Sequence, residues 1–336
     1  MLVDADAHLN ITLEDLVPFM DQPWRLQVER APRSLEPRDI GEVTVGGRIK
    51  RPLKQRPHDT ESPINADISI LFPNQLLSFG LMPNLFIEVA VAIAYSRWIT
   101  QAYLPNHPEA RAMLYLPIRD PDACQKILAD YGEHPGVVGA FITSAGFPQV
   151  HDNRYVHLYS DMQERDLALG FHPTSIWLER PMEIFDRYLA VYALGYPFSQ
   201  CVHLINWVMH GMPERFPQLR CVFCESGIAW LSFISHRLDQ EFMKRPSEAP
   251  ALKDRPSHYI SRYFYTTQPL DLAEETYLES VIRQVGPDQF VYASNFPQWD
   301  FDVPGVIDRL TFLNNKERNN IMGQNAVRLF KQLSNL

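Results

Sequence analysis

Short apolar runs alternate with longer stretches of helical periodicity along this chain of 336 residues. The runs have the length of buried strands, and the stretches between them repeat apolar residues every three or four positions, as amphipathic helices do. Strands are expected at residues 2–6, 67–71, 112–116, 137–142, 168–172, 219–224, 263–266 and 290–293. Helices are expected at residues 83–101, 121–131, 155–167, 228–242, 272–285, 303–313 and 315–333.

This alternation predicts one α/β domain over residues 1–336, folded as a (β/α)8 TIM barrel. A doubly wound open sheet is the alternative. That fold binds dinucleotides through a G-x-G-x-x-G turn after its first strand, and the sequence lacks such a turn. We therefore favour the barrel.

Residues 21–66 interrupt the alternation and form the longest stretch without a clear pattern. Loops of this length are uncommon unless they serve as lids or binding loops. Because the segment lies between the first two strands, we expect it to cover the barrel mouth as a lid-like insertion. It is rich in proline and contains a basic cluster that would attract an acidic substrate, consisting of Arg48, Lys50, Arg51, Lys54 and Arg56. A solvated loop is the alternative.

Composition narrows the class of protein. Of the residues, 46% are hydrophobic and the net charge is −9, which suits a large core and argues against nucleic acid or an anionic membrane as a partner. No apolar run has the length of a membrane helix, and no signal-peptide pattern opens the sequence, so a cytoplasmic protein is expected. The C-x-x-C spacing of Cys221 and Cys224 lies in an apolar run, which predicts buried reduced thiols.

Polar side chains stand at the predicted carboxyl ends of several strands, where barrel enzymes place their catalytic groups. In the first strand, alternation places Asp4, Asp6 and His8 on one face. His172 ends the fifth strand, and Glu225 and Asn295 follow the sixth and eighth. Carboxylate and imidazole groups that meet at one mouth are suitable ligands for a divalent metal.

These positions also have structural explanations. The carboxylates and histidines at strand ends can act as hydrogen-bonding groups of the framework. Glu225 could instead cap the helix that follows it. His203 and His210 lie on a helical stretch at residues 199–212, so packing or surface roles are favoured for them.

The sequence resembles the amidohydrolase superfamily, specifically the amidohydrolase-2 branch that contains the aminocarboxymuconate-semialdehyde decarboxylase-like enzymes. The segments that carry the resemblance, in the order and spacing of that branch, are residues 3–8, 170–175, 214–231, 266–269, 293–302 and 325–330. The resemblance implies a TIM barrel with one divalent metal, zinc or manganese, at its mouth. It also implies hydrolysis by metal-activated water, or non-oxidative decarboxylation, of a small aromatic or unsaturated carboxylic acid, amide or lactone.

The resemblance assigns roles to individual residues and also shows departures. Asp6, His8 and His172 match metal ligands of the family. Asn295 stands where the family carries an aspartate that binds the metal and transfers protons. Gln298 replaces a histidine of the same turn. Glu225 falls where decarboxylase relatives often carry a catalytic histidine.

Asn295 has no titratable group, so a different acid or base is required, and Glu225, Asp4 and His172 are the candidates. The loss of a negative charge at Asn295 should weaken or abolish metal binding. Three hypotheses follow: a metal-dependent enzyme with a displaced acid or base, a metal-independent enzyme that uses Asp6, His8 and His172, and a catalytically silent binding protein.

The sequence does not identify the substrate, although aromatic residues near the expected mouth suit a planar small molecule. The candidates for substrate binding are Trp177, Phe296, Gln298 and Trp299. Barrel packing is the alternative for the aromatic ones. Relatives are often dimers, so a homodimer is a further expectation.

Overall fold

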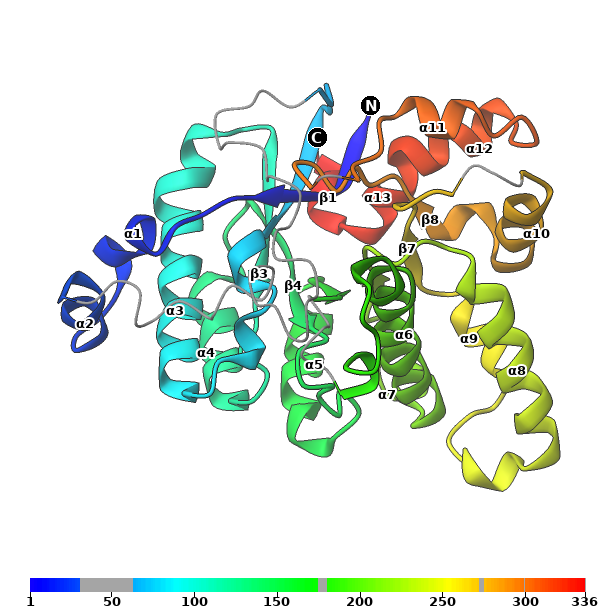
Figure 1. The fold of residues 1–336 in the computed structure, drawn as a ribbon, viewed down its shortest axis with the longest axis horizontal. Coiled ribbons are helices and arrows are strands. Elements are labelled where there is room, and N and C mark those ends of the chain that lie inside the picture. Colours follow the sequence, from blue (N-terminus) through cyan, green and yellow to red (C-terminus); the bar gives the residue numbers. More distant parts are fainter. Residues whose placement is uncertain (31–62, 175–179, 272–274, 299, 336) are drawn as a thin grey trace.

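The structure is a computed structural model that describes residues 1–30, 63–174, 180–271, 275–298 and 300–335. Within them, eight parallel strands form one sheet in the order β1 to β8 (Figure 1). The strands are β1 (Val3–Leu9), β2 (Ile68–Pro73), β3 (Ala110–Tyr115), β4 (Val137–Thr143), β5 (Ala168–His172), β6 (Cys221–Phe223), β7 (Phe264–Thr266) and β8 (Phe290–Val291). Each expected strand is therefore present.

Backbone hydrogen bonds join the last strand to the first. The amide of Ala5 donates to the carbonyl of Tyr292 at 2.9 Å, and beyond β8 the amide of Asn295 donates to the carbonyl of Asp6 at 2.9 Å. An open doubly wound sheet would leave these edges unpaired. The prediction of a TIM barrel is confirmed, and the open-sheet alternative is wrong.

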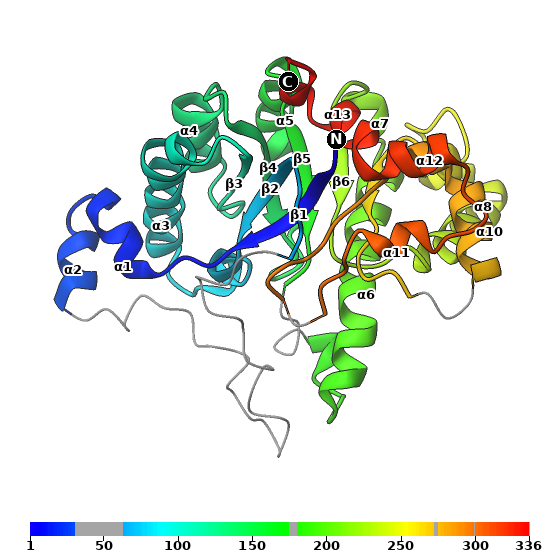
Figure 2. The same cartoon turned by 90° about the horizontal axis from the view of Figure 1, so that it is seen from above.

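Helices surround the barrel (Figures 1 and 2). They are α1 (Leu13–Leu16), α2 (Trp24–Arg30), α3 (Leu85–Trp98), α4 (Pro121–Tyr131), α5 (Val156–Glu164), α6 (Tyr188–Met209), α7 (Met212–Arg215), α8 (Trp230–Lys244), α9 (Pro256–Ile260), α10 (Glu275–Val285), α11 (Gly305–Asp308), α12 (Asn315–Asn319) and α13 (Asn325–Leu329). A π-helical turn extends α3 over Ile99–Tyr103, and another joins α12 to α13 over Asn320–Gln324.

Three helix predictions need correction. The stretch at 303–313 contains only the single turn of α11, and the helix expected at 315–333 is divided by its π-helical turn. The helix expected at 199–212 begins earlier, at Tyr188, and ends at Met209. Pro197 lies inside it, and proline normally ends a helix because it lacks an amide hydrogen, so the sequence concealed the first half of α6.

The expected lid at 21–66 is described only at its two ends. Residues 31–62, with the basic cluster, lie outside the described residues. At the amino-terminal end, Arg97 of α3 donates hydrogen bonds to the carboxylate of Asp21 at 2.8 and 2.9 Å and to the carbonyl of Phe19 at 3.1 Å. The start of the segment is thus fixed to the outer helix layer.

Cysteine and membrane expectations can also be checked. Cys221 and Cys224 are free and buried, and burial raises the pKa of both thiols, as expected for reduced packing residues.

Among the described helices, none is long and apolar enough to cross a membrane. Cytoplasmic localisation and a homodimer stay predictions.

His203 of α6 shows how tightly the helix packs on the barrel. Its ring stacks on Phe171 of β5 with a centroid separation of 5.3 Å. The side chain is fully buried, and neither ring nitrogen has a hydrogen-bond partner among the described residues. Burial lowers the pKa of His203 to about 4, so the folded protein holds this imidazole neutral.

His203 should therefore make the free energy of unfolding fall as the pH falls. Between its unfolded pKa of 6.5 and its folded pKa of about 4, the unfolded chain binds the proton and the folded chain does not. When the pH is lowered from about 7.5 to about 5, the free energy of unfolding of the wild type should fall by about 2 kcal/mol more than that of a His203→Phe variant. Urea unfolding at both pH values measures this difference. His236→Gln, which removes an exposed histidine of α8, serves as the control and should follow the wild type.

Candidate metal centre

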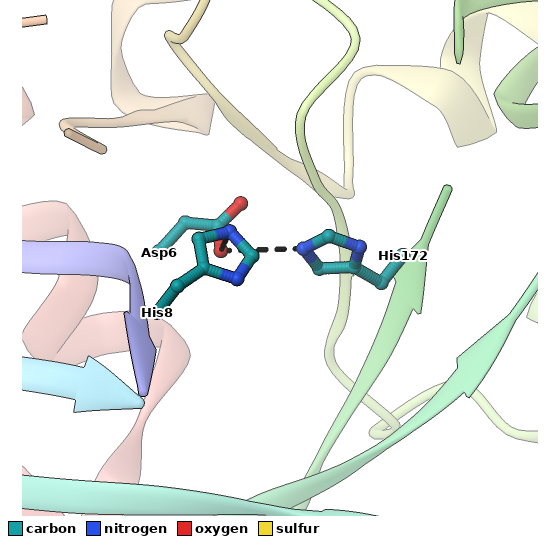
Figure 3. A group of neighbouring side chains, drawn as sticks. All are labelled: Asp6, His8 and His172. Carbon is teal, nitrogen blue, oxygen red and sulfur yellow. Dashed lines mark ion pairs between the residues drawn. The ribbon is translucent and has the colours of Figure 1, made fainter. Parts of the chain in front are cut away.

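Asp6, His8 and His172 meet at the barrel mouth and form what we call the ligand triad (Figure 3). One ligand atom from each lies within 4.8 Å of the other two, and all three residues are buried. The Asp6 Oδ1 atom is 3.5 Å from His8 Nε2 and 3.4 Å from His172 Nε2. The structure thus brings together residues that the sequence placed on β1 and β5.

Local structure explains these positions. Asp6 and His8 are two residues apart on β1, and His172 is the last residue of β5. The two imidazole rings meet edge to face with a centroid separation of 5.3 Å. Phe72 of β2 packs against both rings, at 6.4 Å from His8 and 5.0 Å from His172, so this aromatic residue supports the barrel interior.

The triad has the chemistry of a metal site because its polar atoms are buried without hydrogen-bond partners. Among the described residues, both carboxylate oxygens of Asp6, both nitrogens of His8 and the Nε2 atom of His172 lack a partner. Each such atom costs about 1–3 kcal/mol when it is buried unpaired. A divalent cation would satisfy them together. The residues therefore fit the metal that the resemblance implies.

The protonation state of His172 supports the same conclusion. Its Nδ1 atom lies 2.8 Å from the carbonyl oxygen of Pro173, which accepts a hydrogen bond from the protonated Nδ1. In the neutral form of the ring the lone pair lies on Nε2, which faces Asp6. A backbone carbonyl that fixes the ring in this way is a common feature of metal-bound histidines.

In both histidines burial lowers the pKa and the charge of Asp6 raises it, but the balance of the two effects differs. Burial lowers the pKa of His8 to about 4, although the charge of Asp6 opposes it. Burial also acts to lower the pKa of His172, but the nearby charges of Asp6 and Glu225 outweigh it and raise this pKa. His8 is accordingly a neutral imidazole, the form that binds metals.

Asn295 lies beside the triad, as predicted, and its amide has a defined orientation. The Nδ2 atom donates to Glu225 Oε1 at 3.1 Å and to Asp300 Oδ1 at 3.3 Å. Its Oδ1 atom is buried without a partner among the described residues. The backbone has a φ of 61°, a left-handed conformation that asparagine adopts more readily than most residues.

Glu225 also reaches the site from the end of β6. Its Oε2 atom is 3.7 Å from His172 Nδ1, and burial, the dominant effect, raises its pKa to about 8. Its backbone has a φ of 45°, and its amide donates to Thr266 Oγ1 at 2.9 Å. Helix α8 begins at Trp230 without a side-chain cap, so the capping alternative for Glu225 is wrong.

Asp4 occupies a different environment from the one expected. Its carboxylate accepts hydrogen bonds from the amide of Ser294 at 2.8 Å, from the Ser294 hydroxyl, and from the amide of Asp6 at 3.3 Å. The pairing of β1 with β2 shifts between Asp4 and Ala7, which interrupts the alternation that the sequence suggested. Asp4 joins β1 to β8, and these contacts occupy the carboxylate of this candidate base.

The substrate-binding candidates are only partly described. Trp177 and Trp299 lie outside the described residues. Phe296 is buried and meets Phe301 edge to face at 5.5 Å. Gln298 donates from Nε2 to Asn74 Oδ1 at 2.6 Å, so it joins the β8 loop to the loop after β2.

A row of tyrosines on α6 is an additional feature that the sequence did not reveal. Tyr188, Tyr192 and Tyr196 are four residues apart, and successive rings are 5.5 and 4.7 Å apart. Burial and then the charge of Glu225 raise the pKa of Tyr192 and Tyr196, and the Tyr192 hydroxyl donates to Asp300. Figure 2 shows this end of α6 extending beyond the barrel. The four-residue spacing was visible in the sequence, but Pro197 argued against a helix there.

Asp300 links the tyrosines to the centre. Its Oδ2 atom accepts hydrogen bonds from Tyr192 at 2.5 Å and from Gln268 Nε2 at 3.0 Å, while its Oδ1 atom accepts from Asn295. The sequence gave no reason to single out Asp300, because its partners come from α6, β7 and β8.

Comparison with protein families identifies the group to which this centre belongs. The amidohydrolase family model matches residues 86–332. The chain belongs to the amidohydrolase family. The predictions of this superfamily and of an enzyme from it are confirmed.

Curated relatives of this family member include two gamma-resorcylate decarboxylases. The one from Rhizobium sp. is 24% identical over 233 residues, which cover 66% of this chain and 69% of the relative. The one from Rhodococcus jostii is 23% identical over 236 residues, covering 66% and 70%.

Solved structures with the same fold include decarboxylases that contain manganese. A 5-carboxyvanillate decarboxylase variant from Novosphingobium aromaticivorans, solved with manganese and 3-methoxy-4-hydroxy-5-nitrobenzoic acid, has a TM-score of 0.74 at 16% identity and 98% and 97% coverage. A dihydroxybenzoic acid decarboxylase from Polaromonas sp., solved with manganese and 2-nitroresorcinol, has a TM-score of 0.70 at 17% identity and 98% and 96% coverage.

Manganese should stabilise the folded amidohydrolase through the triad. At a free ion concentration of about 100 times the Kd, binding should add about 2.7 kcal/mol to the free energy of unfolding. Thermal unfolding of metal-stripped protein with and without added manganese measures the change. His172→Ala should lose the shift, whereas the surface variant His236→Gln should keep it. An equal shift in the His172→Ala protein would show that manganese binds elsewhere.

Proposed function

We propose that this protein catalyses the metal-dependent, non-oxidative decarboxylation of a small hydroxylated aromatic acid. The observation that carries the proposal is the ligand triad, whose buried donor atoms lack protein partners and converge on one point. The amidohydrolase relatives that act on gamma-resorcylate support decarboxylation over hydrolysis, although their low identity leaves the substrate itself a proposal.

The triad and the Asn295 Oδ1 atom would hold the cation. A bound divalent cation supplies positive charge for the substrate carboxylate and a neighbouring ring hydroxyl. The neutral Asn295 amide contributes an oxygen but no charge, so we expect a weaker site than one with two carboxylate ligands. Zinc and manganese both suit a set of one carboxylate and two imidazoles.

Glu225 is the group proposed to supply the proton. In the reaction the bond between the ring carbon and the carboxylate carbon breaks, carbon dioxide leaves, and a proton takes its place on the ring. Asn295 has no proton to give. The Glu225 carboxyl group contacts both His172 and Asn295, so it lies at the centre and can give its proton to the ring carbon. The solvent then supplies the one proton that the reaction consumes and restores the Glu225 carboxyl group.

The tyrosines of α6 are the proposed surface for the aromatic ring of the substrate. Their rings lie on one helical face, and Tyr192 is held in place through Asp300. Aromatic side chains favour stacked and edge-to-face contacts with a planar ligand. A small apolar cluster around Met182 and Val191 supports this end of the helix.

Glu225→Gln tests the proposed proton donor. Manganese-loaded protein should release carbon dioxide from acids such as 2,6-dihydroxybenzoate, and the variant should lower kcat by about 10²–10⁴-fold with unchanged manganese content. His172→Ala should lose both metal and turnover, and His236→Gln should retain both. Full turnover by Glu225→Gln would reject the assigned donor. Turnover by metal-free wild type would favour the metal-independent hypothesis.

A further inference from the structure

We propose that Asp300 is a positioning residue that turns the Asn295 amide so that its carbonyl oxygen faces the ligand triad. Asn295 then serves as a neutral oxygen ligand. The inference rests on the proposed metal centre, but it concerns the orientation of one side chain, which can be tested by metal binding without any substrate.

The amide group of Asn295 can adopt two orientations that differ by the exchange of its nitrogen and oxygen atoms. In the observed one, each of the two Nδ2 hydrogens has a carboxylate acceptor, Glu225 Oε1 at 3.1 Å and Asp300 Oδ1 at 3.3 Å. In the exchanged orientation the amide oxygen would face the carboxylate oxygen of Asp300, and neither of these two oxygens can donate a hydrogen bond. The Asp300 carboxylate therefore determines which atom faces the triad, and the Glu225 carboxyl group accepts the second hydrogen of the amide.

The atom left on the other side is the one a cation needs. Asn295 is fully buried, and its Oδ1 atom has no hydrogen-bond partner among the described residues. The residue is also joined to the triad through its backbone, because its amide donates to the carbonyl of Asp6 at 2.9 Å. An unpaired carbonyl oxygen beside three ligand groups is a suitable fourth ligand for a divalent ion.

Asp300 is itself held in place, which distinguishes it from a chance neighbour. The Tyr192 hydroxyl and Gln268 Nε2 both donate to its Oδ2 atom, and Gln268 also donates to its backbone carbonyl at 3.2 Å. Gln268 is buried as well. The Oδ1 atom of Asp300 is thus directed at Asn295 by contacts from α6 and from the end of β7.

Manganese affinity provides the test. Free manganese ions, counted by their electron paramagnetic resonance signal during titration of the metal-stripped protein, give the Kd. Asp300→Ala should weaken binding by about 10–100-fold, as found when groups that orient metal ligands are removed. Asp300→Asn keeps one acceptor oxygen and should retain part of the affinity.

Asp302→Asn is the matched control. It removes the same negative charge from the same loop, and Asp302 accepts a hydrogen bond from the amide of Leu270 and is not among the acceptors of the Asn295 amide. An equal loss of affinity in Asp302→Asn and Asp300→Ala would overturn the proposal, since charge alone would then explain the effect. Should Asp300→Ala not fold, Asp300→Asn should still bind manganese more weakly than Asp302→Asn, and equal affinities would overturn the proposal.

A double-mutant cycle tests whether Asp300 acts through Asn295. In an Asn295→Ala background, adding Asp300→Ala should cause no further loss of affinity. A full additional loss would overturn the proposal. If Asn295→Ala binds too weakly to measure, Asn295 is itself a ligand and the comparison with Asp302→Asn decides the role of Asp300.

Binding and turnover measured on the same preparations separate this inference from the proposed function. Manganese binding that depends on Asp300, without decarboxylation, would support the inference and reject the function. Decarboxylation by the wild type, together with a manganese affinity that does not change in the Asp300 variants, would support the function and reject the inference. If the wild-type protein binds no manganese, the inference is overturned. Whether that protein decarboxylates the substrate then tests the proposed function separately.

Discussion

Closure of the barrel between β1 and β8 is the constraint on which the centre depends. The backbone hydrogen bond from Asn295 to Asp6 joins residues from opposite ends of the chain and places two potential oxygen ligands side by side. The carboxylate of Asp4 adds to this closure, because it accepts hydrogen bonds from the amide and the hydroxyl of Ser294. A barrel that opened here would separate Asp6 from Asn295, so the fold and the metal site form together.

The centre contains several acidic groups, and the amide at position 295 suits them. Asn295 lies between Glu225 and Asp300, at 3.1 and 3.3 Å from their oxygens. Two negative charges at about 3 Å repel by about 5 kcal/mol at an effective dielectric constant of about 20. A carboxylate at position 295 would face this repulsion from Asp300, whereas the amide donates to both neighbours. The asparagine therefore fits the surroundings that Glu225 and Asp300 create.

The sequence predicted those parts of the protein that depend on local patterns. Buried parallel strands are continuous apolar runs, so the strands and the ligand triad at their ends could be predicted. The contacts of Asp4 with Ser294 could not be predicted, because they join segments from opposite ends of the sequence. The first half of α6 was missed because Pro197 resembles a helix end. The Asn295 network could not be predicted, since Glu225 and Asp300 meet only in the folded barrel.

Positions 225 and 295 can be understood as one exchange. By resemblance, decarboxylase relatives often carry a histidine at the first and the family usually carries an aspartate at the second, and this chain carries a glutamate and an asparagine. The exchange keeps one carboxylate beside the triad while moving it from the end of β8 to the end of β6. Because Asn295 and Glu225 remain in hydrogen-bond contact, the acid has moved by about one side-chain length. Proton delivery from β6 would then approach the substrate ring from the side of α6 and its tyrosines.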